Sequence, residues 1–255
     1  YADEGVTIHQ IHPQNEPVAD QKFPSCVWTG EQMRDFIRDH LGPLFAGDAP
    51  DCEIWLGTIN SDDYDGWAGT VLADPGARQF VRGVGYQWAG KAAVQRTRMS
   101  WPDVPMLQTE NECGDGCNTW AYAHYVFGLI QHYFTNGVNG YVYWNMILPP
   151  GGESTWGWRQ NSMITIDPDA GTVTRNPEFH VMKHFSRFVS PGTSLLGLRG
   201  PWTGNALAFE SPDGASVVVV ANPHAEEREL TLGLPGGAAS ARLAPRSFNT
   251  FIASS

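Results

Sequence analysis

The first stretch that predicts tertiary structure is VTIHQIHPQNEP, residues 6–17. Its first half, Val6–Ile11, is apolar and β-branched, which is typical of a buried strand. Pro13 and Pro17 enclose a short polar segment in which a strand cannot continue. The sequence therefore predicts a strand whose carboxyl end leads into a polar loop containing Glu16.

The same alternation of apolar strand and polar loop recurs along residues 6–190, with segments of helical spacing between the strands. The expected strands are Val6–Ile11, Glu53–Ile59, Val81–Trp88, Val104–Glu110 and Tyr141–Leu148. The expected helices start at Thr29, Asp74, Lys91, Trp120 and Asn176-Pro177, while residues 60–67 are expected to form a loop. Five strands that alternate with helices predict a parallel βαβ architecture.

After Pro191-Gly192 the pattern changes to short strands separated by Gly, Pro, Asn and Asp. The expected strands are Leu195–Leu198, Ala206–Glu210, Ser216–Ala221, Arg228–Leu232, Ala239–Leu243 and Phe248–Ile252. This spacing predicts an antiparallel β-sandwich. We therefore expect two domains, residues 1–190 and residues 191–255.

Composition narrows the classes of function. The chain has 255 residues, of which 42% are hydrophobic, so it is long enough to bury a core. A net charge of −11 argues against binding to nucleic acid or to an anionic membrane. No apolar run approaches the roughly 20 residues that span a bilayer, so no membrane insertion is expected. The ten tryptophans instead favour a sugar-binding surface.

The cysteines and clustered aspartates give no strong metal signal, and no metal or organic cofactor is expected. The four cysteines are Cys26, Cys52, Cys113 and Cys117, and none of their spacings is that of a zinc site. Cys113 and Cys117 either form a bridge or remain two thiols. The loop with Asp62, Asp63 and Asp65 is either a calcium site or, more commonly, a solvated turn.

Two glutamates stand at predicted strand ends. Glu16 follows the first strand, where the alternative interpretation is a solvated turn. Glu110 ends the fourth strand, and strict alternation places it on the same face as Met106. If Leu107 faces the helices, Glu110 points to the opposite, interior side. Glu112 has the same parity, so alternation alone does not choose between the two.

A pair of carboxyl groups at the ends of two parallel strands indicates glycoside hydrolysis. One group must donate a proton to the leaving oxygen, while the other must be ionised to attack the anomeric carbon. Retaining enzymes hold the two carboxyl groups about 5 Å apart, whereas inverting enzymes need a wider gap for a water, so the residues alone leave both mechanisms open.

Several motifs, in order along the whole chain, resemble glycoside hydrolase family 30 and its glucosylceramidase-like branch. They are residues 14–17, 23–26, 32–37, 41–43, 74–75, 83–88, 109–110, 144–145, 184–186 and 247–250. The resemblance implies a retaining mechanism on a (β/α)8 TIM barrel joined to a β-sandwich side domain. It also implies an extracytoplasmic location, although the chain opens on Tyr1 with no signal peptide.

The resemblance also implies roles for individual residues. Glu16 corresponds to the acid/base and Glu110 to the nucleophile, so we expect Glu16 to have the higher pKa and the two carboxyl groups to lie about 5 Å apart, the distance of retaining enzymes. Asn15 corresponds to the amide that holds the sugar 2-hydroxyl. The other implied substrate-binding residues are Gln87, Trp88, Trp144, Asn145 and Trp156. Ala89 stands where family members often carry Tyr, which is a departure at that subsite.

By this correspondence the five strands are barrel strands four to eight, and five strands cannot close an eight-stranded barrel. Either a missing N-terminal segment or a second chain completes the barrel. The expected function is therefore a retaining β-glucosidase or glucosylceramidase that acts on a carbohydrate or glycolipid. The alternatives are a β-xylosidase, a β-1,6-glucanase, or a non-catalytic carbohydrate-binding remnant.

Overall fold

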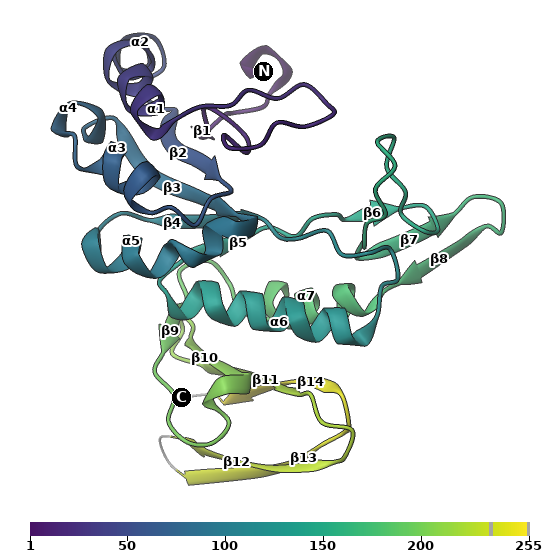
Figure 1. The fold of residues 1–255 in the computed structure, drawn as a ribbon. Helices are drawn as coiled ribbons and strands as arrows, with labels where there is room; N and C mark the ends of the chain where they lie inside the picture. Colours follow the sequence, from purple (N-terminus) through teal and green to yellow (C-terminus); the bar gives the residue numbers. More distant parts are fainter. Residues whose placement is uncertain (235–236, 254–255) are drawn as a thin grey trace. The chain divides into compact units, whose positions relative to one another are not determined.

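A computed structural model of the chain describes residues 1–234 and 237–253 (Figure 1). These residues form two compact units, which are described separately. The first unit contains Tyr1–Glu112 and Tyr133–Tyr143, and the second contains Cys113–His132 and Trp144–Ser255. The division expected at residue 190 does not coincide with these units and stays a prediction.

The described residues of the first unit form a five-stranded parallel sheet with the strand order β1-β2-β3-β4-β5. The strands are β1 (Gln10–Ile11), β2 (Glu53–Ile59), β3 (Val81–Gln87), β4 (Met106–Glu110) and β5 (Gly140–Tyr141). Each strand pairs in parallel with the next strand in the chain. The alternation of strands and helices in the sequence therefore predicted the topology of this sheet correctly.

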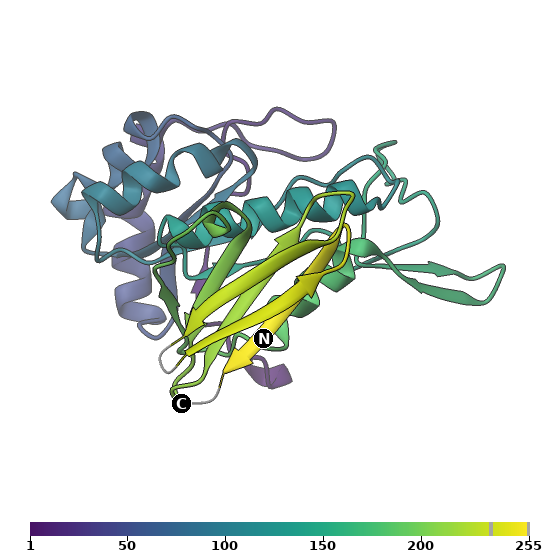
Figure 2. The same cartoon turned by 90° about the horizontal axis from the view of Figure 1, so that it is seen from below.

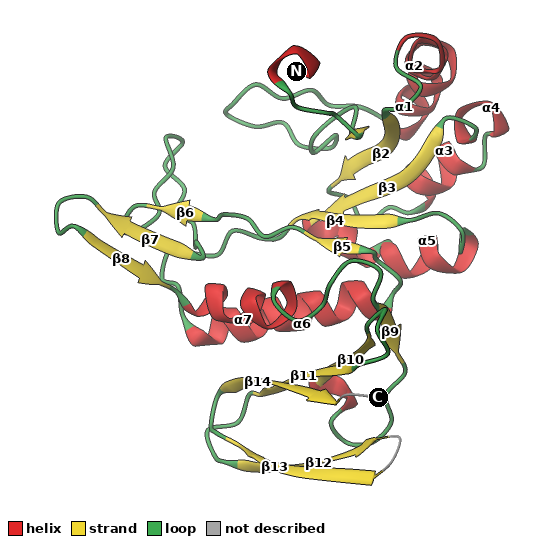
Figure 3. Ribbon diagram, turned by 180° about the vertical axis from the view of Figure 1, so that it is seen from behind, coloured by secondary structure: helices red, strands yellow, loops and turns green. Residues whose placement is uncertain are grey.

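The helical segments among the strands of this unit are η1 (Ala2–Glu4), α1 (Gly30–Phe36), η2 (Ile37–Leu41), α2 (Gly42–Asp48), η3 (Asp65–Gly69), α3 (Thr70–Leu72), α4 (Pro75–Arg78), η4 (Trp88–Ala92) and α5 (Val94–Ser100). Of these, α1 to α5 cover one face of the sheet (Figure 3). Thr29 begins α1 with a capping box, because its hydroxyl accepts from Gln32 N and the Gln32 side chain accepts from Thr29 N. Asp74 caps α4, with Pro75 in the first turn.

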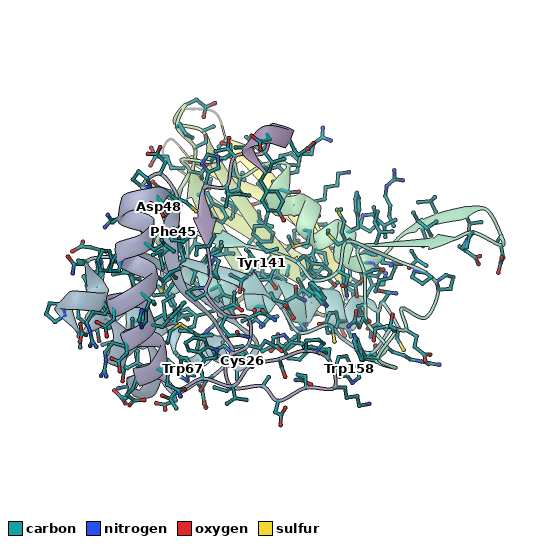
Figure 4. All side chains as sticks on the ribbon, turned by 90° about the horizontal axis from the view of Figure 1, so that it is seen from above. Cys26, Phe45, Asp48, Trp67, Tyr141 and Trp158 are labelled. Atoms are coloured by element: carbon teal, nitrogen blue, oxygen red, sulfur yellow. The ribbon has the colours of Figure 1, made fainter. Side chains whose placement is uncertain are left out.

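Two local predictions in this unit were wrong. β1 is shorter than expected, and Val6 and Ile8 are 48% and 41% exposed, because β1 pairs only with β2 among the described residues. The segment expected as a loop up to Trp67 becomes helical from Asp65. Trp67, labelled in Figure 4, is buried there, so packing of this side chain overrides the polar composition of the segment.

The second unit contains residues 120–132 of α6 (Trp120–Thr135), the helix α7 (Pro177–Ser186) and a sheet of the order β6-β7-β8. These strands are β6 (Ile147–Leu148), β7 (Ile164–Asp167) and β8 (Thr172–Arg175). The strand expected over Tyr141–Leu148 is thus two strands in different sheets. The hairpin of β7 and β8 was not predicted, although the turn sequence from Asp167 to Gly171 is a typical hairpin signal.

The C-terminal residues form the predicted antiparallel strands (Figure 2). They are β9 (Ser194–Leu196), β10 (Ala206–Glu210), β11 (Ser216–Asn222), β12 (Arg228–Leu234), β13 (Gly237–Leu243) and β14 (Ser247–Ala253), with the short helix η5 (Thr203–Asn205) before β10. Among the described residues, β14-β11-β10-β9 form one sheet and β12-β13 another. Their shared core includes Ala208, Val218, Val220, Leu230 and Leu243, as expected for a sandwich.

Candidate active site

Glu16 lies in the loop that follows β1, and β2 fixes its position. Its backbone N–H donates to the carbonyl of Thr58 (3.2 Å), near the end of β2. The Thr58 hydroxyl also donates to Asn15 Oδ1 (2.8 Å), which leaves the amide nitrogen of this exposed side chain to donate outward. Glu16 has a φ of +50°, a left-handed conformation that is uncommon for a residue other than glycine and concentrates at functional sites.

Glu110 ends β4 beyond a β-bulge. Tyr86 pairs with Gln108, but Gln87 pairs with Glu110, so Thr109 is an extra residue on β4. A bulge of this kind redirects the side chains that follow it. The direction of Glu110 therefore depends on the bulge rather than on strict alternation.

The side chains of β4 face the opposite way from the one expected from the sequence. Tyr86 faces helix α5, because its hydroxyl lies 2.5 Å from the Thr97 hydroxyl. A Cβ on the neighbouring Gly85 would contact Thr109, which places Thr109 on the face opposite the helices. Leu107 shares the parity of Thr109, so the expectation that Leu107 faces the helices was wrong. Met106, which is fully buried, has the opposite parity.

Glu110 has a perturbed pKa with identifiable causes. Burial raises the pKa of its carboxyl to about 6, and the negative charge of Glu16 acts in the same direction. The indole N–H of Trp88 donates to Glu110 Oε1 (2.8 Å) and opposes the rise by stabilising the carboxylate. The Glu16 carboxylate therefore acts electrostatically on Glu110. The expected order of the two pKa values stays a prediction.

The residues at the end of β3 surround this carboxylate. Trp88 has a φ of +49°, so it too adopts the left-handed conformation. Gln87 is buried, and its Oε1 accepts from the Thr109 hydroxyl (3.3 Å). The buried amide nitrogen of Gln87 has no hydrogen-bond partner among the described residues. Gln87 and Trp88, two of the predicted substrate-binding residues, thus lie beside the strand end that carries Glu110.

Sequence reasoning missed the partner of Glu112. Lys91 Nζ lies 2.5 Å from Glu112 Oε1, and the same ammonium donates to the carbonyl of Trp88 (3.1 Å). The only sequence signal was a lysine three residues after Trp88, which is too common a pattern to single out. The ion pair gives Glu112 an environment unlike that of Glu110.

His12 lies on the helix-free face of the sheet. A Cβ on Gly85 would contact its ring, so His12 and Thr109 flank the same glycine. Burial lowers the pKa of His12 to about 4, and the imidazole is therefore neutral at neutral pH. His12 thus adds no positive charge beside the two glutamates.

The remaining predicted substrate-binding residues, Trp144, Asn145 and Trp156, belong to the second unit. Trp144 and Trp156 are 43% and 44% exposed. Asn145 is anchored by its amide nitrogen, which donates to Gln160 Oε1 (2.9 Å). Trp158, labelled in Figure 4, lies in the same loop after β6 as Trp156. Their predicted contact with substrate stays a prediction.

The second unit contains a buried carboxyl group that the sequence did not reveal. Glu178, in the first turn of α7, is fully buried, and its Oε1 accepts from the amide nitrogen of Asn161 (2.7 Å). Asn161 Oδ1 in turn accepts from the backbone of Gly116 (2.8 Å), in the loop that follows Glu112. Burial raises the pKa of Glu178 to about 7, and the charge of Asp115 adds to the rise. The sequence of α7 indicated only an apolar helix face, and nothing in it pointed to a buried carboxyl group.

The structure distinguishes between the two interpretations of the cysteines and of the aspartate loop. Cys117 carries a free thiol, so its bridge to Cys113 is not formed. In the aspartate loop, Asp63 accepts from the backbone of Gly66 (2.9 Å), and Asp65 pairs with Arg96 (2.8 Å). No group of three or more His, Cys, Asp or Glu side chains in residues 1–234 and 237–253 is placed to hold a metal ion. None of the helices in this part of the chain has the length and apolarity needed to cross a membrane.

Comparison with family descriptions gives two matches in order along the chain. Residues 1–189 match "Glycosyl hydrolase family 30 TIM-barrel domain", and residues 205–251 match "Glycosyl hydrolase family 30 beta sandwich domain". Together these ranges include Glu16, Glu110 and the strands β10 to β13.

Curated relatives and solved structures agree with these matches. The chain is 28% identical to a lysosomal acid glucosylceramidase of Mus musculus, over 92% of the chain and 50% of the relative. It is 25% identical to an endo-1,6-β-D-glucanase of Neurospora crassa, over 93% and 52%. The crystal structure of SrfJ from Salmonella typhimurium has a TM-score of 0.89 at 25% identity, over 100% of this chain and 59% of that one. The chain spans about half the length of the curated relatives it matches.

Proposed function

The chain belongs to glycosyl hydrolase family 30, and from this membership we propose that it carries the two catalytic carboxyl groups of a retaining β-glycoside hydrolase. In this proposal Glu110 is the nucleophile and Glu16 is the acid/base. The observation that carries it is the environment of Glu110, which combines partial burial, an indole donor and the charge of a second glutamate. Such perturbed carboxyl groups concentrate at active sites.

The proposed reaction has two displacements. First, a carboxylate oxygen of Glu110 bonds to the anomeric carbon while the bond to the leaving oxygen breaks, and Glu16 gives its proton to that oxygen. Then Glu16 takes a proton from water, the water oxygen bonds to the anomeric carbon, and the ester to Glu110 breaks. The pKa of about 6 keeps Glu110 ionised at neutral pH, as the first step needs.

The environment of Glu112 argues against this residue as the nucleophile. Its carboxylate is paired with Lys91, and an attack on the sugar would have to break that ion pair. The glycine-rich stretch Cys113–Gly116 follows directly, and such a stretch holds a side chain less firmly than a strand does. Glu110, by contrast, ends a paired strand.

For the substrate we propose a β-linked glucosyl unit, as in a glucosylceramide or a simple β-glucoside. The glucosylceramidases among the relatives support this choice. A second candidate is a β-1,6-linked glucan, because the relatives also include endo-1,6-β-D-glucanases. Both substrates present a β-glucosidic bond to the same pair of carboxyl groups.

The test is covalent trapping combined with turnover. The purified chain is incubated with a 2-fluoro β-glucoside that forms a stable glycosyl ester, and the labelled peptide is mapped. We expect the label on Glu110, with Glu110→Gln abolishing both label and turnover of an aryl β-glucoside. For Glu16→Gln, we expect kcat to fall about 10²–10⁴-fold on substrates with poor leaving groups, the usual contribution of a general acid.

Glu112→Gln is the matched control, because it changes a neighbouring carboxyl group on the same strand end. It should keep the label on Glu110. Label on Glu112 in the unmodified chain would overturn the assignment. A folded chain that neither turns over glucosides nor takes the label would instead be a non-catalytic carbohydrate-binding remnant. Turnover of glucosylceramide compared with β-1,6-glucan distinguishes the two substrate classes.

A further inference from the structure

Lys91 makes two contacts that the two-carboxyl mechanism does not use. It lies in η4, directly after β3, and its ammonium group contacts both the Trp88 carbonyl (3.1 Å) and Glu112 Oε1 (2.5 Å). The two side chains of the ion pair are only 34% and 21% exposed. A partly buried pair is less screened by water and salt than a fully exposed pair.

These contacts join the ends of two neighbouring strands. Trp88 follows β3, and Glu112 follows β4 at two residues beyond Glu110. Asn111, between the two glutamates, is buried, and its amide nitrogen donates to the carbonyl of Glu112 (2.7 Å). Lys91 therefore links the segment that carries the indole donor to the segment that carries its acceptor.

Trp88 needs such support. A non-glycine residue in the left-handed region is strained, and it persists only where its surroundings hold it. The hydrogen bond from Lys91 holds the peptide carbonyl of this residue, while the indole donates to Glu110. A change at Lys91 should therefore move the indole without touching any atom of the reacting pair.

We propose that Lys91 is a positioning residue that holds the Trp88 indole on the carboxylate of Glu110 by joining the Trp88 carbonyl to Glu112. The role of Glu110 in this inference rests on the function proposed above. The positioning itself is a property of the folded chain and is measurable without turnover.

The consequence is a change in the acidity of Glu110. The groups that act on it are the Glu16 carboxylate from the loop after β1 and the Trp88 indole from the end of β3. Nearby, Lys91 and Glu112 pair with each other, and His12 is neutral because its pKa is about 4. The indole is the group that opposes the rise, so loss of its hydrogen bond should raise the pKa of Glu110 further.

The experiment measures the pKa of Glu110 by carbon-13 NMR of glutamate-labelled chain, with Glu110→Gln to assign the signal. Lys91→Met removes the ammonium group and keeps the length of the side chain. We expect it to raise the pKa of Glu110 by about one unit, the size of effect that one hydrogen bond to a carboxylate produces. Trp88→Phe should give a similar rise. The double variant should add nothing further, because both changes remove the same interaction.

Lys22→Met is the matched control, since Lys22 is an exposed lysine in the loop before α1. It should leave the pKa of Glu110 unchanged. A wild-type pKa in folded Lys91→Met, or fully additive effects in the double variant, would overturn the proposal. Kinetics gives a second readout, in which Lys91→Met lowers kcat more than it changes KM and moves the acid limb of kcat/KM to higher pH. A shifted pKa in a chain without turnover would instead count against the proposed function while leaving the positioning role intact.

Discussion

At the scale of single residues, the candidate site depends on hydrogen bonds that fix side chains before any substrate arrives. Thr58 is an example, because its hydroxyl donates to Asn15 Oδ1 and its carbonyl accepts from Glu16 N. One residue of β2 thus orients two neighbouring residues of the loop after β1. Such preorganised groups lose little freedom when a substrate binds.

Thr58→Val tests this orientation, because it keeps the shape of the side chain and removes only the hydroxyl. We expect kcat/KM for an aryl β-glucoside to fall about tenfold, the equivalent of one hydrogen bond of about 1.4 kcal/mol in the transition state. Thr58→Ser keeps the hydroxyl and should retain most of the activity. Equal activities of the Val and Ser variants would show that the hydroxyl does not orient Asn15.

The pKa of Glu110 gives a second residue-scale prediction. Glu16 raises this pKa by its negative charge, so Glu16→Gln should lower the pKa of Glu110 from about 6 toward the ordinary glutamate value. In the unmodified chain, activity should fall as the pH drops through about 6, because Glu110 becomes protonated and cannot attack. The NMR titration of Glu110 in both proteins checks the shift, and an unchanged pKa would mean that the two carboxyl groups do not interact.

Some residues of the candidate site could be predicted from the sequence, and others could not. Glu16 and Glu110 were recognisable because each stands where an apolar run meets a polar loop. The direction of the Glu110 side chain could not be predicted. One extra residue in the β3–β4 ladder changes this direction, and the local composition does not indicate a bulge. The Lys91–Glu112 pair and buried Glu178 were also missed, since both depend on contacts between residues distant in the sequence.

At the scale of secondary-structure elements, α1 packs closely against the segment η3. A Cβ on Gly30, in the first turn of α1, would lie 1.8 Å from the backbone oxygen of Gly66. That backbone must therefore shift if any side chain is placed there. Helix propensity disfavours glycine at position 30, but the close contact with Gly66 leaves no room for a side chain there.

Gly30→Ala should therefore destabilise the chain by at least about 1–3 kcal/mol, the usual cost of overpacking. Gly47→Ala is the matched control in the next α-helix, because a Cβ there meets nothing within 4 Å. Alanine at that exposed position should be neutral or stabilising by up to about 1 kcal/mol. Urea unfolding of the two variants measures both effects. Equal stabilities would show that the α1 contact is looser than described.

The elements also show which predictions a sequence supports. The bounds of β2 and β10 were predicted correctly, because an apolar run paired on both sides has one stable arrangement. Val6–Ile8 was also apolar and was expected as a strand, but it precedes β1 at the edge of the sheet and belongs to no strand among the described residues. The presence of a strand to pair with, rather than the composition of the segment, decides whether such an apolar run forms a strand.

At the scale of the whole molecule, the family assignment confirms the fold class, a TIM-barrel domain followed by a β-sandwich. The described residues contain the parallel strands β1 to β5, which matches the expected set of barrel strands four to eight. Both edge strands of this sheet, β1 and β5, have only two residues in the ladder. Short edge strands limit the unpaired backbone that a sheet offers to other chains.

The stability of the whole chain should also depend on pH through its buried titratable groups. Glu178 has a folded-state pKa of about 7, above the ordinary value of 4.5. Between these two values the folded state holds more protons than the unfolded state, so this group makes stability fall as the pH rises from about 4.5 to about 7. His12, with its pKa lowered to about 4, acts in the opposite direction between about 4 and 6.5.

Because these contributions overlap, the sharpest test is a comparison rather than a single pH profile. Glu178→Gln cannot ionise, and its carbonyl oxygen can still accept from Asn161, so the contact to the loop after Glu112 is kept. The stability of this variant relative to the unmodified chain should therefore increase from pH 4.5 to pH 7, by up to about 3 kcal/mol for a shift of this size. Urea unfolding at a series of pH values measures the difference, and Glu4→Gln, at an exposed position, should show no such trend. If the curves of the unmodified chain and Glu178→Gln ran parallel across this range, Glu178 would have to be ionised in the folded state at ordinary pH, in contact with a cation or water that offsets its burial.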